Sequence, residues 1–232
     1  MAALGLTIHH ACKLTPITEE ELMEYSYYAI NNLNFLAKTA TGGFQSLIEE
    51  NDWEASIQQK EMVVETNLWK TLKLIWEYAE KGMNLERIKS EYHMDDLLTD
   101  LYKWSSACNS TLLYDGHFGH EKIEVRESSI KLAYKFLARL KLDFEFNILD
   151  ELPSSGLYPV AHSTMLTTVE YSLLAGLSHI GAVRNEVCKI KDPLVIEKEG
   201  GNILITIPVA RKFLQKKRKF ISTEGIDYGQ VN

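Results

Sequence analysis

Apolar residues in the first half of the chain recur at steps of three and four, the spacing of one face of an α-helix. One stripe covers 22–47, a second covers 62–79 and stops near Lys81 and Gly82, and the polar run 49–52 separates them. Thr18 and Glu21 form a capping box that predicts where the first helix begins. The pattern predicts two long amphipathic helices that fold back on each other as a hairpin.

Each stripe is wider than one partner helix can cover. A hairpin of this kind pairs with a second copy into a four-helix bundle, so we expect a homodimer. Residues 84–113 continue with helical spacing, and the loop 114–120, which contains two glycines and two histidines, is the expected domain boundary.

Strands enter the pattern in the second half of the chain. The predicted elements are a helix over 123–140, a half-buried strand over 143–149, a short strand over 157–160, a buried helix over 166–180, and a hairpin of 194–197 with 203–209. The fold class is therefore α+β, with helices on one face of a small sheet. The expected organisation is a tail over 1–17, a helical dimerisation domain over 18–116, an α/β domain over 117–210 and a basic tail over 211–232.

The order strand, acidic-Leu-Pro turn, short strand and apolar helix over 143–181 resembles the start of the ATP-binding domain of sensor histidine kinases. Together with the helical hairpin in front of it, residues 18–210 resemble a histidine kinase core. They also resemble the histidine phosphotransferases of phosphorelays, which share both parts but have lost ATP binding.

The positions that hold ATP in such kinases are replaced here. His162 follows Ala161 where the family has Gly-Asp, and Ser172 and Gly176 stand where it has the Asn residues of its metal box. Mg²⁺ requires oxygen ligands, which glycine lacks. The stretch 208–211 also lacks the Asp-x-Gly-x-Gly motif. The resemblance therefore implies a degenerate kinase domain, and we expect no cofactor.

The resemblance places Asn31 where the hairpin would carry its phosphoacceptor His. An amide nitrogen is not a nucleophile, so we expect a docking face for a receiver domain or a histidine kinase. The residues predicted to form it are Tyr27, Tyr28, Asn31, Asn32, Asn34 and Lys38. In the alternative interpretation these asparagines are ordinary polar residues on the helix exterior.

Other histidines offer weaker candidates for chemistry. His93, at a helix junction, and His10, before Pro16, are the catalytic candidates, as phosphoacceptor or as acid–base group. His117 and His120 have the His-x-x-His spacing of a zinc site, although no second ligand pair accompanies them.

Composition narrows the partners. The net charge of −7 argues against nucleic acid as a partner. No apolar run approaches the length of a membrane span, which needs about 18 to 20 residues. The three cysteines are widely separated, as in cytoplasmic proteins. The basic run 211–219 is interpreted as a solvated helix face, with a binding site as the alternative.

These observations favour a non-catalytic adaptor or regulator of two-component signalling. One alternative is an active histidine phosphotransferase that uses a His elsewhere in the chain. A further alternative is an unrelated helical interaction module, and a last one is a metal-dependent enzyme around His117 and His120.

Overall fold

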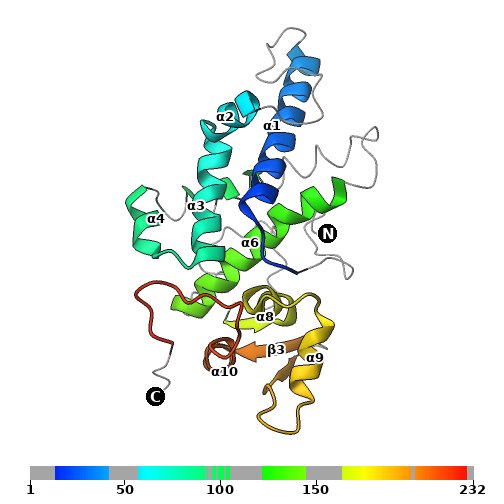
Figure 1. Ribbon diagram of the computed structural model, residues 1–232, viewed down its shortest axis with the longest axis vertical. Coiled ribbons are helices and arrows are strands. Elements are labelled where there is room, and N and C mark those ends of the chain that lie inside the picture. Colours follow the sequence, from blue (N-terminus) through cyan, green and yellow to red (C-terminus); the bar gives the residue numbers. More distant parts are fainter. Residues whose placement is uncertain are drawn as a thin grey trace.

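The fold was analysed in a computed structural model, which describes residues 14–41, 57–91, 93, 96–97, 99–101, 103–104, 122–144, 164–199 and 202–228. Its elements are α1 (Glu19–Thr41), α2 (Ile57–Val64), α3 (Asn67–Lys81), α4 (Leu85–Glu91), α6 (Lys122–Phe144), β1 (Met165–Thr167), α8 (Thr168–Ala175), α9 (Gly181–Val187), β2 (Glu197–Glu199), β3 (Asn202–Thr206) and α10 (Ile207–Leu214). The molecule is elongated, and α6 crosses it obliquely between a helical half and a half that contains the sheet (Figure 1). The predicted α+β class is confirmed.

The helical half packs α1, α3 and α6 around one apolar cluster, whose members include Tyr25, Ile75 and Phe136. The first helix begins as predicted. The Thr18 hydroxyl accepts the amide of Glu21 at 3.1 Å, and the Glu21 carboxylate accepts the amide of Thr18 at 2.7 Å. This capping box satisfies amide groups that have no partner inside the helix.

The second predicted helix is divided in two. α2 ends at Val64, and Thr66 is the N-cap of α3, where its hydroxyl accepts the amide of Trp69 at 3.3 Å. A threonine in extended conformation can interrupt an apolar stripe without changing its spacing, so the stripe alone did not reveal the break. α3 ends as predicted, at Gly82 with φ 70°.

Helix α6 is longer than predicted and replaces the beginning of a predicted strand. Asp143 and Phe144 form its last turn, so a strand from Asp143 is wrong. The alternating pattern is a local signal, whereas the side chain of Asp143 is held by tertiary hydrogen bonds from α3 and the C-terminal segment. Residues 145–149 and 157–160 lie outside the described residues.

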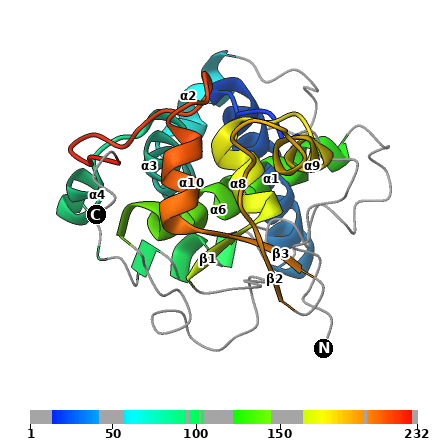
Figure 2. The same ribbon diagram turned by 90° about the horizontal axis from the view of Figure 1, so that it is seen from below.

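The sheet has three antiparallel strands in the order β1-β3-β2. Leu166 pairs with Ile205, and both are fully buried. α8 and α10 pack against the sheet and lie side by side (Figure 2). The predicted hairpin of β2 and β3 is confirmed, although β2 covers Glu197–Glu199 and not the predicted 194–197.

Two other elements in this half also differ from the prediction in their bounds. The helix expected over 166–180 begins with strand β1 and ends at Gly176, whose φ of 62° terminates α8. The strand expected over 203–209 ends at Thr206, because Pro208 occupies the first turn of α10. In both places a capping residue, Gly176 or Thr206, ends an element inside a longer and mostly apolar stretch.

Two predictions about domain organisation concern the boundary loop 114–120 and the basic C-terminal tail. The boundary loop 114–120 lies outside the described residues and stays a prediction, while α6 contributes Phe136 to one apolar cluster and Leu142 to the other. Residues 211–228 do not form a free basic tail, since they start inside α10 and then return to the core, where Thr223 and Tyr228 are buried.

Candidate functional site

Helix α6 carries charged side chains that are buried, and this is the most unusual feature of the fold. They are Lys131, Lys135, Arg139, Lys141 and Asp143, and none is more than 8% exposed. Removing an ion from water costs several kcal/mol unless a partner compensates it. The partners of these side chains therefore show what this part of the molecule does.

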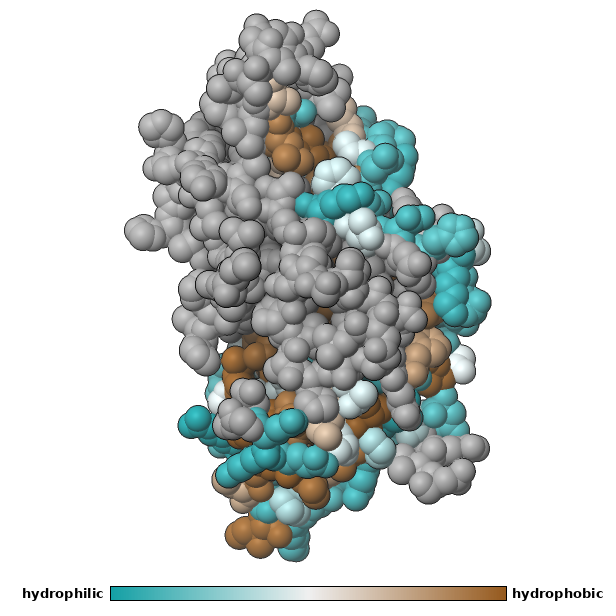
Figure 3. All heavy atoms as spheres, turned by 180° about the vertical axis from the view of Figure 1, so that it is seen from behind, coloured by the Kyte–Doolittle hydropathy of each residue, from teal (hydrophilic) through white to brown (hydrophobic). Residues whose placement is uncertain are grey.

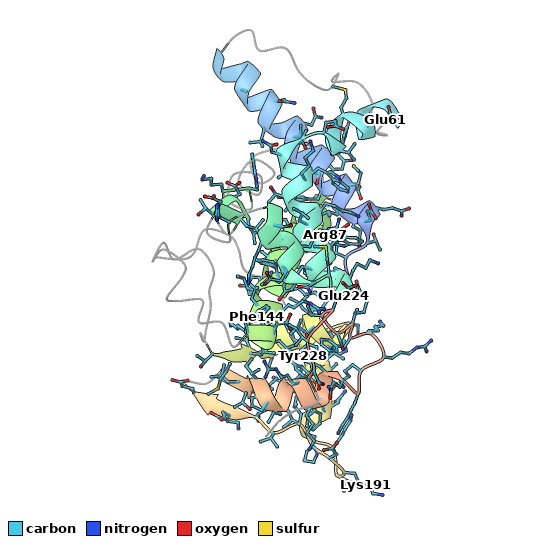
Figure 4. The ribbon with its side chains drawn as sticks, turned by 90° about the vertical axis from the view of Figure 1, so that its left-hand side faces the viewer. Glu61, Arg87, Phe144, Lys191, Glu224 and Tyr228 are labelled. Carbon is cyan, nitrogen blue, oxygen red and sulfur yellow. The ribbon has the colours of Figure 1, made fainter. Side chains whose placement is uncertain are left out.

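Asp143, in the last turn of α6, is the centre of a hydroxyl cluster. Its carboxylate accepts hydrogen bonds from Tyr78 at 2.7 Å, from Thr223 at 2.7 Å and from Tyr228. Figure 4 shows Tyr228 close to the end of α6 that carries Phe144. The cluster thus joins α3, α6 and the C-terminal segment.

Arg139 lies one turn earlier on α6 and is almost completely buried. Its guanidinium donates to the carbonyl of Ala79 at 3.2 Å, and to the carbonyl of Ile221 and the hydroxyl of Thr223, both at 2.8 Å. A planar guanidinium with five donors suits this bridging of main-chain groups. It adds a second attachment of the C-terminal segment.

Lys135 forms a buried ion pair with Glu80 of α3, at 2.5 Å between Nζ and Oε2. The other carboxylate oxygen accepts the amide of Ile17 at 3.1 Å, and Trp76 donates to the carbonyl of Ile17 at 2.8 Å. Burial lowers the pKa of Lys135, and the neighbouring Glu80 opposes that shift. This pair anchors the segment in front of α1.

Lys141 forms a second buried ion pair, with Glu170 of α8 at 2.6 Å between Nζ and Oε1. Lys141 also donates to the carbonyl of Met165 at 3.3 Å, and Glu170 accepts the amide of Thr167 at 2.8 Å in the capping box of α8. The pair links α6 to β1 and α8.

Buried ionisable groups occur both in active sites and in structural networks. Each of the clusters around Glu80, Asp143 and Glu170 connects secondary-structure elements that are distant in sequence. Among the described residues, no group of three His, Cys, Asp or Glu side chains is placed to hold a metal ion. The arrangement acts as a structural network centred on α6.

The buried tyrosines provide a test of this network. Burial and the neighbouring Asp143 raise the pKa of Tyr228 to about 12, and they also raise the pKa of Tyr78. Burial, together with Glu170 or Glu186, raises the pKa values of Tyr134 and Tyr171. The hydroxyl groups of all four tyrosines are therefore weaker acids than that of an exposed tyrosine, whose pKa is about 10.

Titration by absorbance at 295 nm should leave at least these four of the 11 tyrosines protonated at pH 11 while the chain is folded. Between pH 10 and 12 the unfolded state loses protons that the folded state retains. The free energy of unfolding should therefore fall with rising pH, by about 1.4 kcal/mol per unit for each such tyrosine. Ionisation of all 11 tyrosines near pH 10 in folded protein would contradict the network.

The predicted docking residues do not all lie at the surface. Tyr27 is only 4% exposed and belongs to the helical apolar cluster, so the prediction of a surface position for it is wrong. The stripe that faces the core is wide enough to include it. Tyr28 packs against the same cluster and meets Tyr27 edge to face. Asn31 and Asn34 are half-buried, and the side chains of Asn32 and Lys38 are not among those described.

The predicted degenerate nucleotide positions have structural roles where they are described. Ser172 is buried and donates to the carbonyl of Thr168 at 2.6 Å. Gly176 ends α8, and a Cβ atom there would lie 2.8 Å from a side-chain carbon of Lys219. His162 lies outside the described residues.

Of the four histidine candidates, only His93 lies among the described residues. His93 is exposed, whereas His10, His117 and His120 lie outside the described residues. In the described part of the chain, no helix is both long and apolar enough to cross a membrane. No family model, curated protein or solved structure matches this chain significantly.

Sequence reasoning missed the α6 network, although a signal was present. Lys131, Lys135, Arg139 and Asp143 recur every four residues, the pattern of a solvated helix face. However, apart from these residues and Lys141, all positions of this helix from Ile130 onward are apolar. This part of the helix therefore has no second polar face. A charged stripe on a helix that is apolar elsewhere was the available indication of burial.

Proposed function

We propose that the protein is a non-catalytic adaptor or regulator that docks a partner on the upper half of α1. The resemblance of residues 18–210 to a histidine kinase core makes a receiver domain or a histidine kinase of a two-component pathway the partner class. The ionisable groups of the α6 network are engaged in holding the fold together, which supports a scaffold. The second half serves this scaffold as an ATPase-like module without nucleotide.

The observation that carries the proposal is the polar stripe of Asn31, Asn34 and Lys38, spaced by three and four residues. Tyr27 is in the core, and the two asparagines are half-buried. The amide nitrogen of Asn34 is buried and has no acceptor among the described residues. A packed partner helix would supply one, since buried amides in proteins are normally hydrogen-bonded.

The same stripe suits a second copy of the chain. A buried Asn in a helical seam can select register and oligomeric state, and the amide nitrogen of Asn34 is buried without an acceptor among the described residues. Pairing of the hairpin into a four-helix bundle is therefore part of the proposal. Sedimentation equilibrium measures it directly, and a monomer at all concentrations would remove the homodimer while leaving partner docking to be judged separately.

Docking is tested with receiver domains and histidine kinase cores from the source organism, each purified singly and titrated by calorimetry. The N31K/N34K variant should weaken the best interaction at least tenfold. Glu24→Lys, an exposed position earlier on the same helix, is the matched control and should change it less than twofold. Helix content by circular dichroism verifies that both variants fold.

The same mixtures test whether the protein is non-catalytic. Incubation with phosphorylated receiver and kinase should leave no acid-labile phosphoryl group on this chain. A label on any His, with His93 the exposed candidate, would favour the active phosphotransferase. If no receiver or kinase binds, the signalling role is wrong and the unrelated interaction module remains.

A further inference from the structure

Two basic segments that are separate in sequence meet at the end of the molecule opposite the upper half of α1. The first is the loop after α9, with Lys189 and Lys191, and the second is the end of α10 and the turn directly after it, with Lys212 and Lys216. Figure 4 places Lys191 at this extremity. We call these four lysines and Ile190 the basic tip.

Asp192 holds the two segments together. Its carboxylate lies 3.8 Å from Nζ of Lys212 and also contacts Nζ of Lys216. Lys216, Lys212 and Lys189 together lower the pKa of Asp192, so this single carboxylate stays ionised among them. One negative charge among the four lysines of the basic tip leaves it electropositive.

The surrounding sequence strengthens the imbalance. Residues 184–219 contain ten lysines and arginines against four acidic residues, although the whole chain has a net charge of −7. Arg218 and Lys219 are exposed and follow Lys216 in sequence, after Lys217, which pairs with Glu186. Charge is thus segregated along the molecule, and segregation attracts an anionic surface more strongly than the net charge suggests.

An apolar side chain stands among these lysines. Ile190 has no neighbours that cover it, with an exposed fraction of 101%, and Val195 nearby in sequence is 61% exposed. The tip end of the molecule in Figure 3 shows hydrophobic and hydrophilic surface side by side. Because the side chain of Ile190 is fully exposed, it buries no apolar surface in the fold and does not stabilise it.

We propose that the basic tip binds the surface of an anionic lipid bilayer, with the lysines at the headgroups and Ile190 inserted among the acyl chains. Lysines near an anionic leaflet are attracted by its surface potential, and a buried aliphatic group adds hydrophobic binding. Contact of this kind is peripheral and requires no spanning helix. Nucleic acid fits less well, because single-strand binding relies on aromatic stacking and the tip presents an aliphatic side chain.

The test is co-sedimentation of the full chain with vesicles. Phosphatidylcholine vesicles containing 30% phosphatidylserine should bind at least tenfold more tightly than vesicles of phosphatidylcholine alone. Raising salt from 0.05 M to 0.5 M should weaken the interaction severalfold, because exposed charges are screened. Failure to bind anionic vesicles at low salt would overturn the proposal.

Variants separate the two contributions. K189E/K191E should reduce binding at least tenfold, whereas K70E/K103E makes the same charge change on exposed lysines of the helical half and should leave binding within threefold. Equal losses in both variants would mean attraction without a site. Ile190→Ser should weaken binding with the charge unchanged, and no loss there would exclude insertion.

An inserted probe gives a direct readout. In the Ile190→Trp variant, brominated acyl chains should quench the tryptophan fluorescence more strongly than they quench that of the four native tryptophans in the unchanged chain. A labelled DNA duplex and a single-stranded RNA serve as competitors. If either binds more tightly than the anionic vesicles and depends on Lys189 and Lys191, the tip is a nucleic-acid site and the lipid proposal is wrong. Binding at the tip is independent of docking on α1.

Discussion

Asp143→Ala should lower the free energy of unfolding by about 3 to 5 kcal/mol, the range for breaking a buried charged network. The substitution leaves the hydroxyls of Tyr78, Tyr228 and Thr223 without their shared acceptor. It also removes a negative charge one helical turn from the buried Arg139. Urea unfolding followed by circular dichroism measures the change.

The same variant should loosen the C-terminal segment before the whole chain unfolds. Thr223 and Tyr228 attach this segment to α6, so trypsin should cut the lysine-rich stretch 216–219 several times faster. Local opening is detected by proteolysis when it is more frequent than global unfolding. Cleavage at the wild-type rate would show that the hydroxyl cluster does not hold the segment.

Two controls accompany Asp143→Ala. Asp143→Asn keeps the volume and one acceptor oxygen, so it should lose less, about 1 to 3 kcal/mol. Glu224→Gln changes an exposed carboxylate of the same segment and should stay within about 0.5 kcal/mol. A loss for Glu224→Gln as large as that for Asp143→Ala would place the effect in net charge instead of in the cluster.

Lys141→Met and Glu170→Gln should each destabilise the protein by about 3 kcal/mol, because each leaves one buried charge without its counterion. The ion pair joins α6 to α8 with the lysine side chain fully buried. Glutamine at position 170 can still accept the amide of Thr167, so the capping box is retained. The loss then reports the charge and not the helix cap.

The double variant K141M/E170Q should lose less than the sum of the two single variants, by about 2 kcal/mol or more, since neither charge remains. A cycle on Lys89 and Glu86 provides the matched comparison. These side chains lie 2.8 Å apart but are exposed, so their coupling should be below about 1 kcal/mol. Equal coupling in both cycles would contradict the importance of burial for the Lys141–Glu170 pair.

The sequence predicted elements well where the signal was local. The capping box of Thr18 and Glu21, the stop at Gly82 and the turn between β2 and β3 are defined by a few adjacent residues, and all three were found. Boundaries failed where an apolar run continued across a cap, as at Thr66 and Thr206. Periodicity detects a face but not the residue at which the backbone leaves the helix.

The candidate sites show the same division. Asn31 and Asn34 were identified from the sequence, but their half-buried positions could not be, because exposure depends on which helices cover the stripe. Tyr27 was placed at the surface for the same reason and proved to be in the core. The basic tip arises only when the chain brings Lys191 and Lys216 together around Asp192.

By itself the sequence determined the α+β class, the first helix, the hairpin of β2 and β3 and the polarity of each stripe, because these depend on neighbours within a few residues. Only the tertiary structure decided that the charged stripe of α6 is interior, that Tyr228 returns to Asp143, and that two basic segments form one tip. Those features depend on contacts between residues up to 85 positions apart, and the energy of a buried charge is set by the partners that folding brings to it.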